Sequence, residues 1–167
     1  MRCRSAGFTL VEMIMTVFVL AILTSIGMQS YQSVVTSTRM SGRINSLLGT
    51  LALARSEAMK RGQTVNVCPV LSPSASTSAC TTVTDWTTGW VVLPTSASPT
   101  PLQISTALTN GDTLTSSSTA YPTFSQTGYT FFAGTLSLHD TNSTPSLYRC
   151  IVFIAGSWST KKGAACP

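Results

Sequence analysis

The chain has 167 residues, a formal net charge of +5 at pH 7 and only 9% charged residues. A single histidine and the absence of a Cys-x-x-Cys pair argue against a metal centre, and no cofactor is expected. The acids are scattered along the chain and no glycine-rich phosphate loop is present, which argues against an enzyme.

The chain begins with a short basic stretch followed by a long apolar one. Residues 1–7 contain Arg2 and Arg4, whereas the 21 residues 8–28 contain no basic side chain. As an α-helix, a segment of this length would span roughly 31 Å, which matches a bilayer core of about 30 Å. We therefore predict a leader over residues 1–7 and a membrane-spanning helix half over residues 8–28, with the basic end cytoplasmic and the rest exported.

One acid, Glu12, interrupts the apolar segment. A carboxylate at the centre of a membrane helix costs about 2.5–3.5 kcal/mol, so such an acid is a functional candidate whose counter-charge should be sought. No Lys or Arg lies between Phe8 and Arg39, and the nearest counter-charge would be an α-amino group made by cutting the chain before Phe8. Two plainer interpretations are a tolerated acid in an ordinary anchor and a secretory signal cut near residues 25–27.

Residues 7–12, Gly-Phe-Thr-Leu-Val-Glu, resemble the prepilin processing site of type IV pilins and type II secretion pseudopilins. The resemblance implies cleavage after Gly7 by a prepilin peptidase and N-methylation of Phe8. It also implies that Glu12 docks against the Phe8 amine of a neighbouring subunit during assembly. Loss of the leader would leave eight basic and five acidic side chains, a formal charge of +3.

Residues 29–61 are predicted to continue the helix as an amphipathic half. Apolar residues recur at three- and four-residue steps and form one stripe, which a sheet should cover. Gly62 stands where a helix normally ends, and Glu57 and Arg61 would pair across the last turn. The basic side chains of this half are expected to face neighbouring subunits or solvent. The stripe consists of Ile44, Leu47, Leu48, Leu51, Ala54, Ala58 and Met59.

After residue 62 the hydrophobic pattern changes to that of β-strands. The predicted strands are residues 64–68, 89–93, 128–132, 135–138 and 148–154. Polar spacers at residues 72–82, 95–101 and 115–123 are expected to be surface loops. His139 and Asp140 are sequence neighbours, and adjacent strand residues point to opposite faces, so they should not form a catalytic pair. Residues 62–167 thus form one exported, β-rich domain of an α+β protein.

Four cysteines remain once the leader and Cys3 are removed, an even number in an exported domain. Three disulfide connectivities are possible. The preferred one joins Cys68 to Cys80 and Cys150 to Cys166, because each pair brackets a loop-like stretch. A closed loop of about 15 residues stabilises by about 3 kcal/mol in the chain-entropy model.

Several further segments resemble the GspH/FimT/FimU group of minor pilins and pseudopilins. They are residues 54–58 followed by Lys60-Arg61-Gly62, the strand that ends at Cys68-Pro69, and the Trp86-x-x-Gly89-Trp90 pattern. The resemblance covers residues 6–93 and becomes weaker beyond them. It implies a lollipop-shaped, pilin-like fold, in which a long N-terminal helix carries an antiparallel β-domain on its outer half. Members of this group act as minor subunits that prime filament assembly, and some bind DNA.

DNA-binding members of the group carry a Gly-Arg-x-Arg type of tail, from which this chain departs. Residues 156–159 are Gly-Ser-Trp-Ser, and positive charge follows only at Lys161 and Lys162. If Cys150 pairs with Cys166, residues 156–165 form a closed loop that displays Trp158 and both lysines. Phosphate contacts and base stacking, worth about 1–3 kcal/mol per base, would then bind nucleic acid. The plainer alternative is solvated lysines beside a core tryptophan.

The sequence as a whole predicts a minor pilin that is trimmed, methylated and moved from the inner membrane into a type IV pilus. Its expected partners are other pilins, the prepilin peptidase and the inner membrane. Two alternatives remain: a DNA-binding minor pilin of natural transformation and a minor pseudopilin of a type II secretion system. The β-domain is expected in the periplasm and, after assembly into a pilus, at the cell surface.

Overall fold

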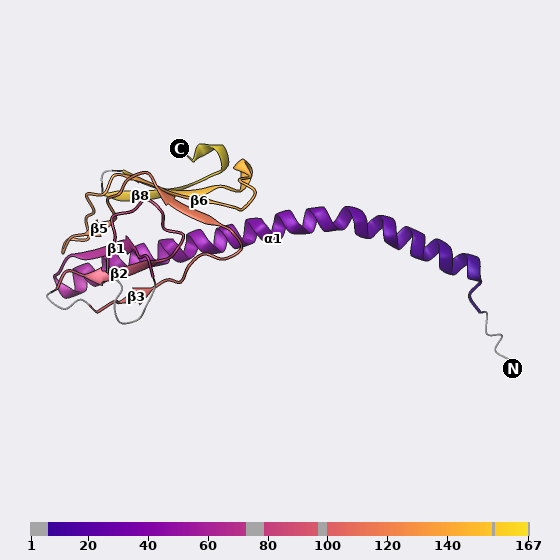
Figure 1. Ribbon diagram of the computed structural model, residues 1–167, viewed down its shortest axis with the longest axis horizontal. Helices are drawn as coiled ribbons and strands as arrows, with labels where there is room; N and C mark the ends of the chain where they lie inside the picture. Colours follow the sequence, from indigo (N-terminus) through magenta and orange to yellow (C-terminus); the bar gives the residue numbers. More distant parts are fainter. Residues whose placement is uncertain (1–6, 73–78, 97–99, 155, 167) are drawn as a thin grey trace. The chain divides into compact units, whose positions relative to one another are not determined.

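A computed structural model describes residues 7–72, 79–96, 100–154 and 156–166, without the side chains of residues 26–30. The chain forms two units, residues 1–37 and 38–167, each of which is described by itself. Helix α1 (Leu10–Arg61) is continuous over 52 residues and belongs to both (Figure 1). A long N-terminal helix followed by antiparallel sheets is the predicted α+β architecture.

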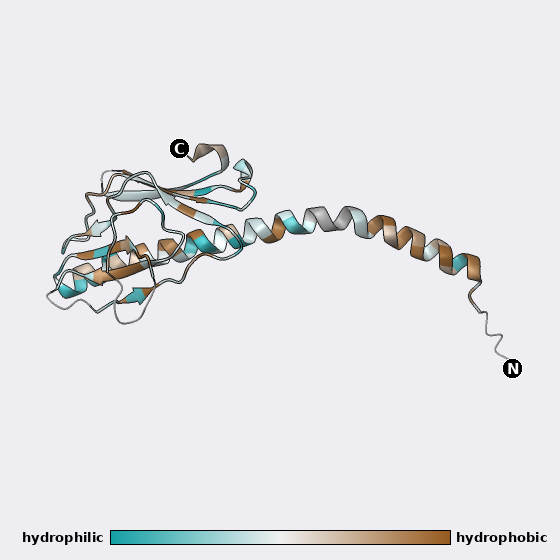
Figure 2. Ribbon diagram, in the orientation of Figure 1, coloured by the Kyte–Doolittle hydropathy of each residue, from teal (hydrophilic) through white to brown (hydrophobic). Residues whose placement is uncertain are grey.

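The first unit consists of the start of α1 and the residues before it. Its large apolar side chains are widely exposed, from 75% at Leu10 to 43% at Val35. Figure 2 shows the first turns of α1 coloured mainly as hydrophobic. A helix that is apolar on all sides requires burial in a protein or in lipid.

No helix in the described part of the chain is both long enough and apolar enough to traverse a bilayer. The predicted span of residues 8–28 includes residues 26–28, whose side chains lie outside the described ones.

The second unit places two four-stranded antiparallel sheets against the last part of α1. The first sheet has the strand order β3-β2-β1-β5 and the second the order β4-β6-β7-β8 (Figure 1). Two short 3₁₀ helices, Pro145–Leu147 and Gly163–Ala165, flank the last two strands. In chain order the strands are β1 (Val65–Pro69), β2 (Trp90–Pro94), β3 (Gln103–Ile104), β4 (Thr113–Ser116), β5 (Thr123–Phe124), β6 (Gly134–His139), β7 (Arg149–Ile154) and β8 (Ser157–Lys162).

The core lies between α1 and the inner faces of both sheets. Most of the predicted helix stripe is buried there, and Met40 extends it by one turn. Met59, predicted as part of the stripe, is instead 48% exposed. On the sheets, alternate residues face the helix, as Val65 and Val67 do on β1. The stripe thus fixes which face of each strand is apolar.

Two glycines occupy backbone conformations that other residues rarely adopt. Gly62 has φ +60° and ends α1, and the following amide, of Gln63, donates to Ala58 O at 3.3 Å. This is the Schellman hydrogen bond expected after a helix. Gly89 has φ +121°, and a Cβ there would collide with the backbone oxygen of Ser105. Its backbone, within the Trp86-x-x-Gly89-Trp90 pattern, therefore lies close to the segment after β3.

The last turn of α1 carries the predicted ion pair. Arg61 Nε donates to Glu57 Oε2 at 2.5 Å, and Lys60 Nζ lies 3.7 Å from the other carboxylate oxygen. The hydrogen bond from Arg61, with attraction to both cations, lowers the pKa of Glu57 below its ordinary value of 4.5. A carboxyl group whose pKa is lower in the folded chain than in the unfolded chain stabilises the fold at any pH above its unfolded-state pKa. This stabilisation is lost as the pH falls through the folded-state pKa.

We therefore expect Glu57→Gln to lower the melting temperature near pH 7 and to lower it progressively less as the pH falls below 4.5. The effect at neutral pH should be small, because the pair lies at the surface. Thermal unfolding of the full chain in a neutral detergent, followed by circular dichroism across this range, measures the difference. An equal change in melting temperature at neutral and at acidic pH would contradict the lowered pKa of Glu57.

The strand prediction was wrong in three places. Residues 128–132 form no strand, because the chain turns at Ser125–Gly128 and only Thr130 makes a bridge, with Phe124. Residues 115–123, expected as a loop, contain the end of β4 and the start of β5. Residues 157–162, expected within a closed loop, form β8. The expected loops at 72–82 and 95–101 lie partly outside the described residues.

Candidate functional site

The predicted processing site lies at the exposed start of the described chain. Gly7 and Phe8 precede the helix, and the Phe8 side chain is 73% exposed. Thr9 caps α1, since its side-chain oxygen accepts the backbone amide of Glu12 at 3.3 Å. Thr9 and Glu12 have the residue types and spacing of a capping box. The bond between Gly7 and Phe8 is thus one residue outside the first helical cap, where an enzyme can reach the backbone.

Among the polar side chains of residues 10–25, that of Glu12 makes no hydrogen bond or ion pair with any described residue. The other polar side chains there satisfy their hydroxyl groups within the helix. Thr16 donates to Met13 O at 2.8 Å, Thr24 to Leu20 O at 2.9 Å and Ser25 to Ile22 O at 2.8 Å. The first turns of α1 therefore present an apolar surface with one acid available to an external cation.

The surroundings of Glu12 determine how much an external cation would stabilise its carboxylate. Met15, Val19 and Leu20 lie beside Glu12 along one groove of the helix surface. If this surface is covered by apolar neighbours, an isolated carboxylate there would be costly, and an amine in contact with it would remove most of that cost. The geometry can thus select one axial position of a partner helix, because the cation must come level with Glu12.

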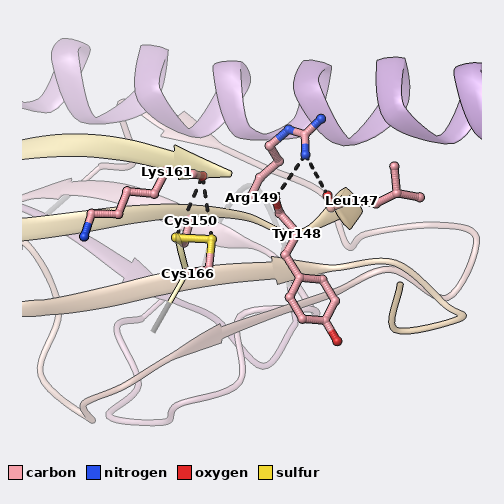
Figure 3. The surroundings of a disulfide bond; sticks show 6 residues. All are labelled: Leu147, Tyr148, Arg149, Cys150, Lys161 and Cys166. Carbon is pink, nitrogen blue, oxygen red and sulfur yellow. Dashed lines mark hydrogen bonds between the residues drawn. A yellow bond between two sulfur atoms is a disulfide. The ribbon is translucent and has the colours of Figure 1, made fainter. Parts of the chain in front are cut away.

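The second candidate region is the β7–β8 hairpin, together with the disulfide beneath it. The structure joins Cys150 to Cys166 with Cα atoms 5.7 Å apart, and Cys68 to Cys80 with Cα atoms 5.3 Å apart. Figure 3 shows the Cys150–Cys166 bond on the side of β7 that faces away from α1. Its sulfurs lie 3.8 and 3.6 Å from the carbonyl oxygen of Lys161. The disulfide therefore ties the segment that follows β8 to the buried start of β7.

Trp158 lies on the helix-facing side of β8. Its ring meets Phe124 edge to face at 5.7 Å between centroids, and the Arg55 guanidinium lies 5.8 Å from its centre. Only part of the ring is accessible, and Arg55, which is exposed as expected, also packs over it. The structure thus separates Trp158 from the two exposed lysines that the sequence grouped with it, and their contact with DNA stays a prediction.

Arg149, which the sequence analysis did not select, lies in the same hairpin and is only 6% exposed. Its Nη1 donates to the carbonyl oxygens of Leu147 and Tyr148, each at 3.0 Å, and its side chain points toward α1 (Figure 3). Strand alternation could have revealed it, because residues 149, 151 and 153 share the inward face of the predicted strand. An arginine at an inward strand position is uncommon and marks a polar end of the core.

The histidine and its neighbouring acid are used structurally. The His139 ring stacks on Tyr148 with centroids 4.1 Å apart, and Asp140 Oδ1 accepts the backbone amide of Thr144 at 2.8 Å. No group of three or more metal-ligating side chains occurs within the described residues.

Comparisons with known proteins agree with this architecture. The family model described as type II transport protein GspH matches residues 43–156, and the prokaryotic N-terminal methylation motif matches residues 2–28. Two crystal forms of the Pseudomonas aeruginosa type IV minor pilin FimU share the fold. One has 17% identity and a TM-score of 0.61 and covers 78% of this chain and 93% of that one. The other has 20% identity and a TM-score of 0.54 and covers 74% and 93%. No curated protein sequence matches the chain.

Proposed function

Because the chain belongs to the family described as type II transport protein GspH, we propose that it is a minor pilin of a type IV pilus. In this proposal it is a non-enzymatic subunit that is made as an anchored precursor and then packed into a filament. The observation that carries the proposal is Glu12, an acid with no partner among the described residues on a helix surface that is otherwise apolar. The methylation motif supports processing at its start.

The proposed sequence of events uses the chain's own residues. A prepilin peptidase cuts after Gly7, and the new amine of Phe8 is methylated. The helix of residues 8–28 holds the precursor in the inner membrane, while the β-domain is periplasmic. On assembly the apolar surface moves from lipid to neighbouring helices, and Glu12 meets the Phe8 amine of another subunit. Apolar packing provides the affinity and the ion pair selects the register.

Mass spectrometry of the chain purified from its native membrane tests this proposal. We expect a mature chain that starts at N-methylated Phe8 and co-purifies with other pilins. A start at any other residue would contradict the proposed processing. Co-purification with type II secretion components instead would favour the alternative role of a pseudopilin, which shares the same helical half and differs in its partners.

DNA binding remains a second candidate function because the basic residues of β8 are exposed. Lys161 and Lys162 end the strand, and the Cys150–Cys166 bond holds that end in place. Two neutralised phosphates would give a binding constant that falls moderately with salt.

A further inference from the structure

The inner face of the β7–β8 hairpin changes from apolar to basic along its length. On β7 the inward residues are Phe153, Ile151 and then Arg149. On β8 the residues opposite them are Trp158, Thr160 and then Lys162. The apolar part of this hairpin face therefore ends at Arg149 and Lys162, although the core continues to Met40 on α1.

A polar cleft of about 340 Å³ lies at that end of the hairpin. One wall is α1 and the other is the end of the hairpin. No acidic side chain lines the cleft, judged from the described part of the chain. Its lining residues are Ser41, Ile44, Asn45, Arg149, Thr160, Lys161 and Lys162.

Two cations face each other directly across the strands at this cleft. Arg149 pairs with Lys162 in the β7–β8 register, so their side chains leave the sheet on the same side. Like charges directly opposite in a sheet destabilise it, and the opposed Cβ atoms are only about 4.5–5.5 Å apart. An anion between the two side chains would turn this repulsion into attraction. Arg149 is largely buried and its Nη1 donates to the carbonyl oxygens of Leu147 and Tyr148, so the guanidinium is held in position before a ligand arrives.

We propose that this cleft binds the phosphate group of an anionic ligand. Arg149 and Lys162 supply the charge, and the hydroxyl groups of Ser41 and Thr160 and the Asn45 amide surround it with further donors. The planar guanidinium suits a tetrahedral oxyanion with several acceptor oxygens. Lys161 lines the cleft from the neighbouring position on β8 and contributes less, because adjacent strand residues point to opposite faces.

The phosphate could come from a nucleic-acid backbone or from a free phosphate or small phosphate ester. The cleft would bind the phosphate group by the same contacts in each case. The proposal does not depend on filament assembly. It places the ligand against Arg149 and Lys162 rather than on the ring of Trp158, which is packed between Phe124 and Arg55.

Inorganic phosphate is the first probe, tested on the full chain in a neutral detergent. Thermal unfolding is compared in phosphate and in chloride of equal ionic strength, and the affinity is measured by calorimetry. We expect phosphate to raise the melting temperature and Lys162→Gln to weaken its binding about tenfold, the loss of one charge-assisted hydrogen bond. Arg149→Lys, which keeps the charge and loses the fork, should weaken it as well.

Arg43→Gln is the matched control, because Arg43 carries the same charge on α1 outside the cleft and bonds to Thr109 at 2.7 Å. We expect it to change phosphate affinity less than about twofold, an estimate for a screened charge that does not line the cleft. The exposed position of Lys162 keeps the test valid even if Arg149→Lys fails to fold. Equal losses in Arg43→Gln and Lys162→Gln would overturn the proposal, since they would indicate diffuse attraction without a site.

A single-stranded oligonucleotide and an acidic peptide complete the experiment. Competition between the oligonucleotide and phosphate, lost in Lys162→Gln, supports the proposal and identifies a nucleic-acid backbone as the source. Phosphate binding without such competition supports it and identifies a small phosphate compound. No phosphate binding by the unmodified chain overturns it, and binding of the acidic peptide alone would assign the cleft to a protein partner instead.

Discussion

Glu12→Ala is expected to abolish incorporation of the chain into filaments while leaving cleavage after Gly7 intact. In the proposed assembly, removing the carboxylate leaves the Phe8 amine of a neighbouring subunit charged and unpaired in apolar surroundings. Breaking one side of a buried pair costs about 3–5 kcal/mol. The affinity for the growing filament should therefore fall by roughly 100- to 1,000-fold or more.

The experiment compares the amount of the chain in sheared filaments with the amount in the membrane. Thr16→Ala is the control, since Thr16 lies one turn further along the same groove and its hydroxyl is satisfied within the helix. It should be incorporated normally. Mass analysis of the membrane fraction verifies that both variants are cut. Normal incorporation of a correctly processed Glu12→Ala chain would remove the ion pair from the mechanism.

The second large effect is expected at Arg39, which ties α1 to the turn before β4. Its Nη2 lies 2.8 Å from Asp112 Oδ1, with the Asp112 side chain fully buried and that of Arg39 27% exposed. Asp112 Oδ2 and Arg39 Nε have no hydrogen-bond partner in the described residues, so this one contact balances the buried carboxylate. Arg39→Met should destabilise the fold by about 3–5 kcal/mol because it leaves that carboxylate unpaired.

Arg43 again provides a matched control, because it reaches from the next turn of α1 to the same segment. It bonds to the exposed hydroxyl of Thr109, so Arg43→Met should cost less than about 0.5 kcal/mol. Adding Asp112→Leu to Arg39→Met should restore part of the lost stability, since it removes the unpaired charge. Denaturant unfolding of the full chain in detergent measures all three variants. Equal losses for the two arginine variants would contradict the assigned role of Asp112.

The helix and its boundaries could be predicted because their causes are local. The apolar spacing of residues 44–58 and the position of Gly62 depend on neighbours only a few residues away. The same is true of β6 and most of β7, where alternation is strong. The motif at residues 7–12 was recognisable for a related reason, since all of its residues are contiguous in the sequence.

Short polar strands were not predictable in this way. β4 and β8 are rich in serine and threonine, and their strand conformation depends on the hydrogen bonds that β6 and β7 offer them. Residues 128–132, in contrast, were predicted to form a strand and do not. Their side chains favour a strand, but the preceding turn directs the chain away from a partner and leaves a single bridge at Thr130.

The sequence by itself determined the long helix, its buried stripe and the acid near its start, because these depend on spacing along one segment. The tertiary structure alone decided that Arg39 meets Asp112 and that Arg149 and Lys162 face α1 across a cleft. These groups are far apart in the sequence, and their contacts depend on strand register and on which face of each strand turns inward. A shift of one residue in β8 would turn Lys162 to the opposite face, and no pattern of charges along the chain specifies that register.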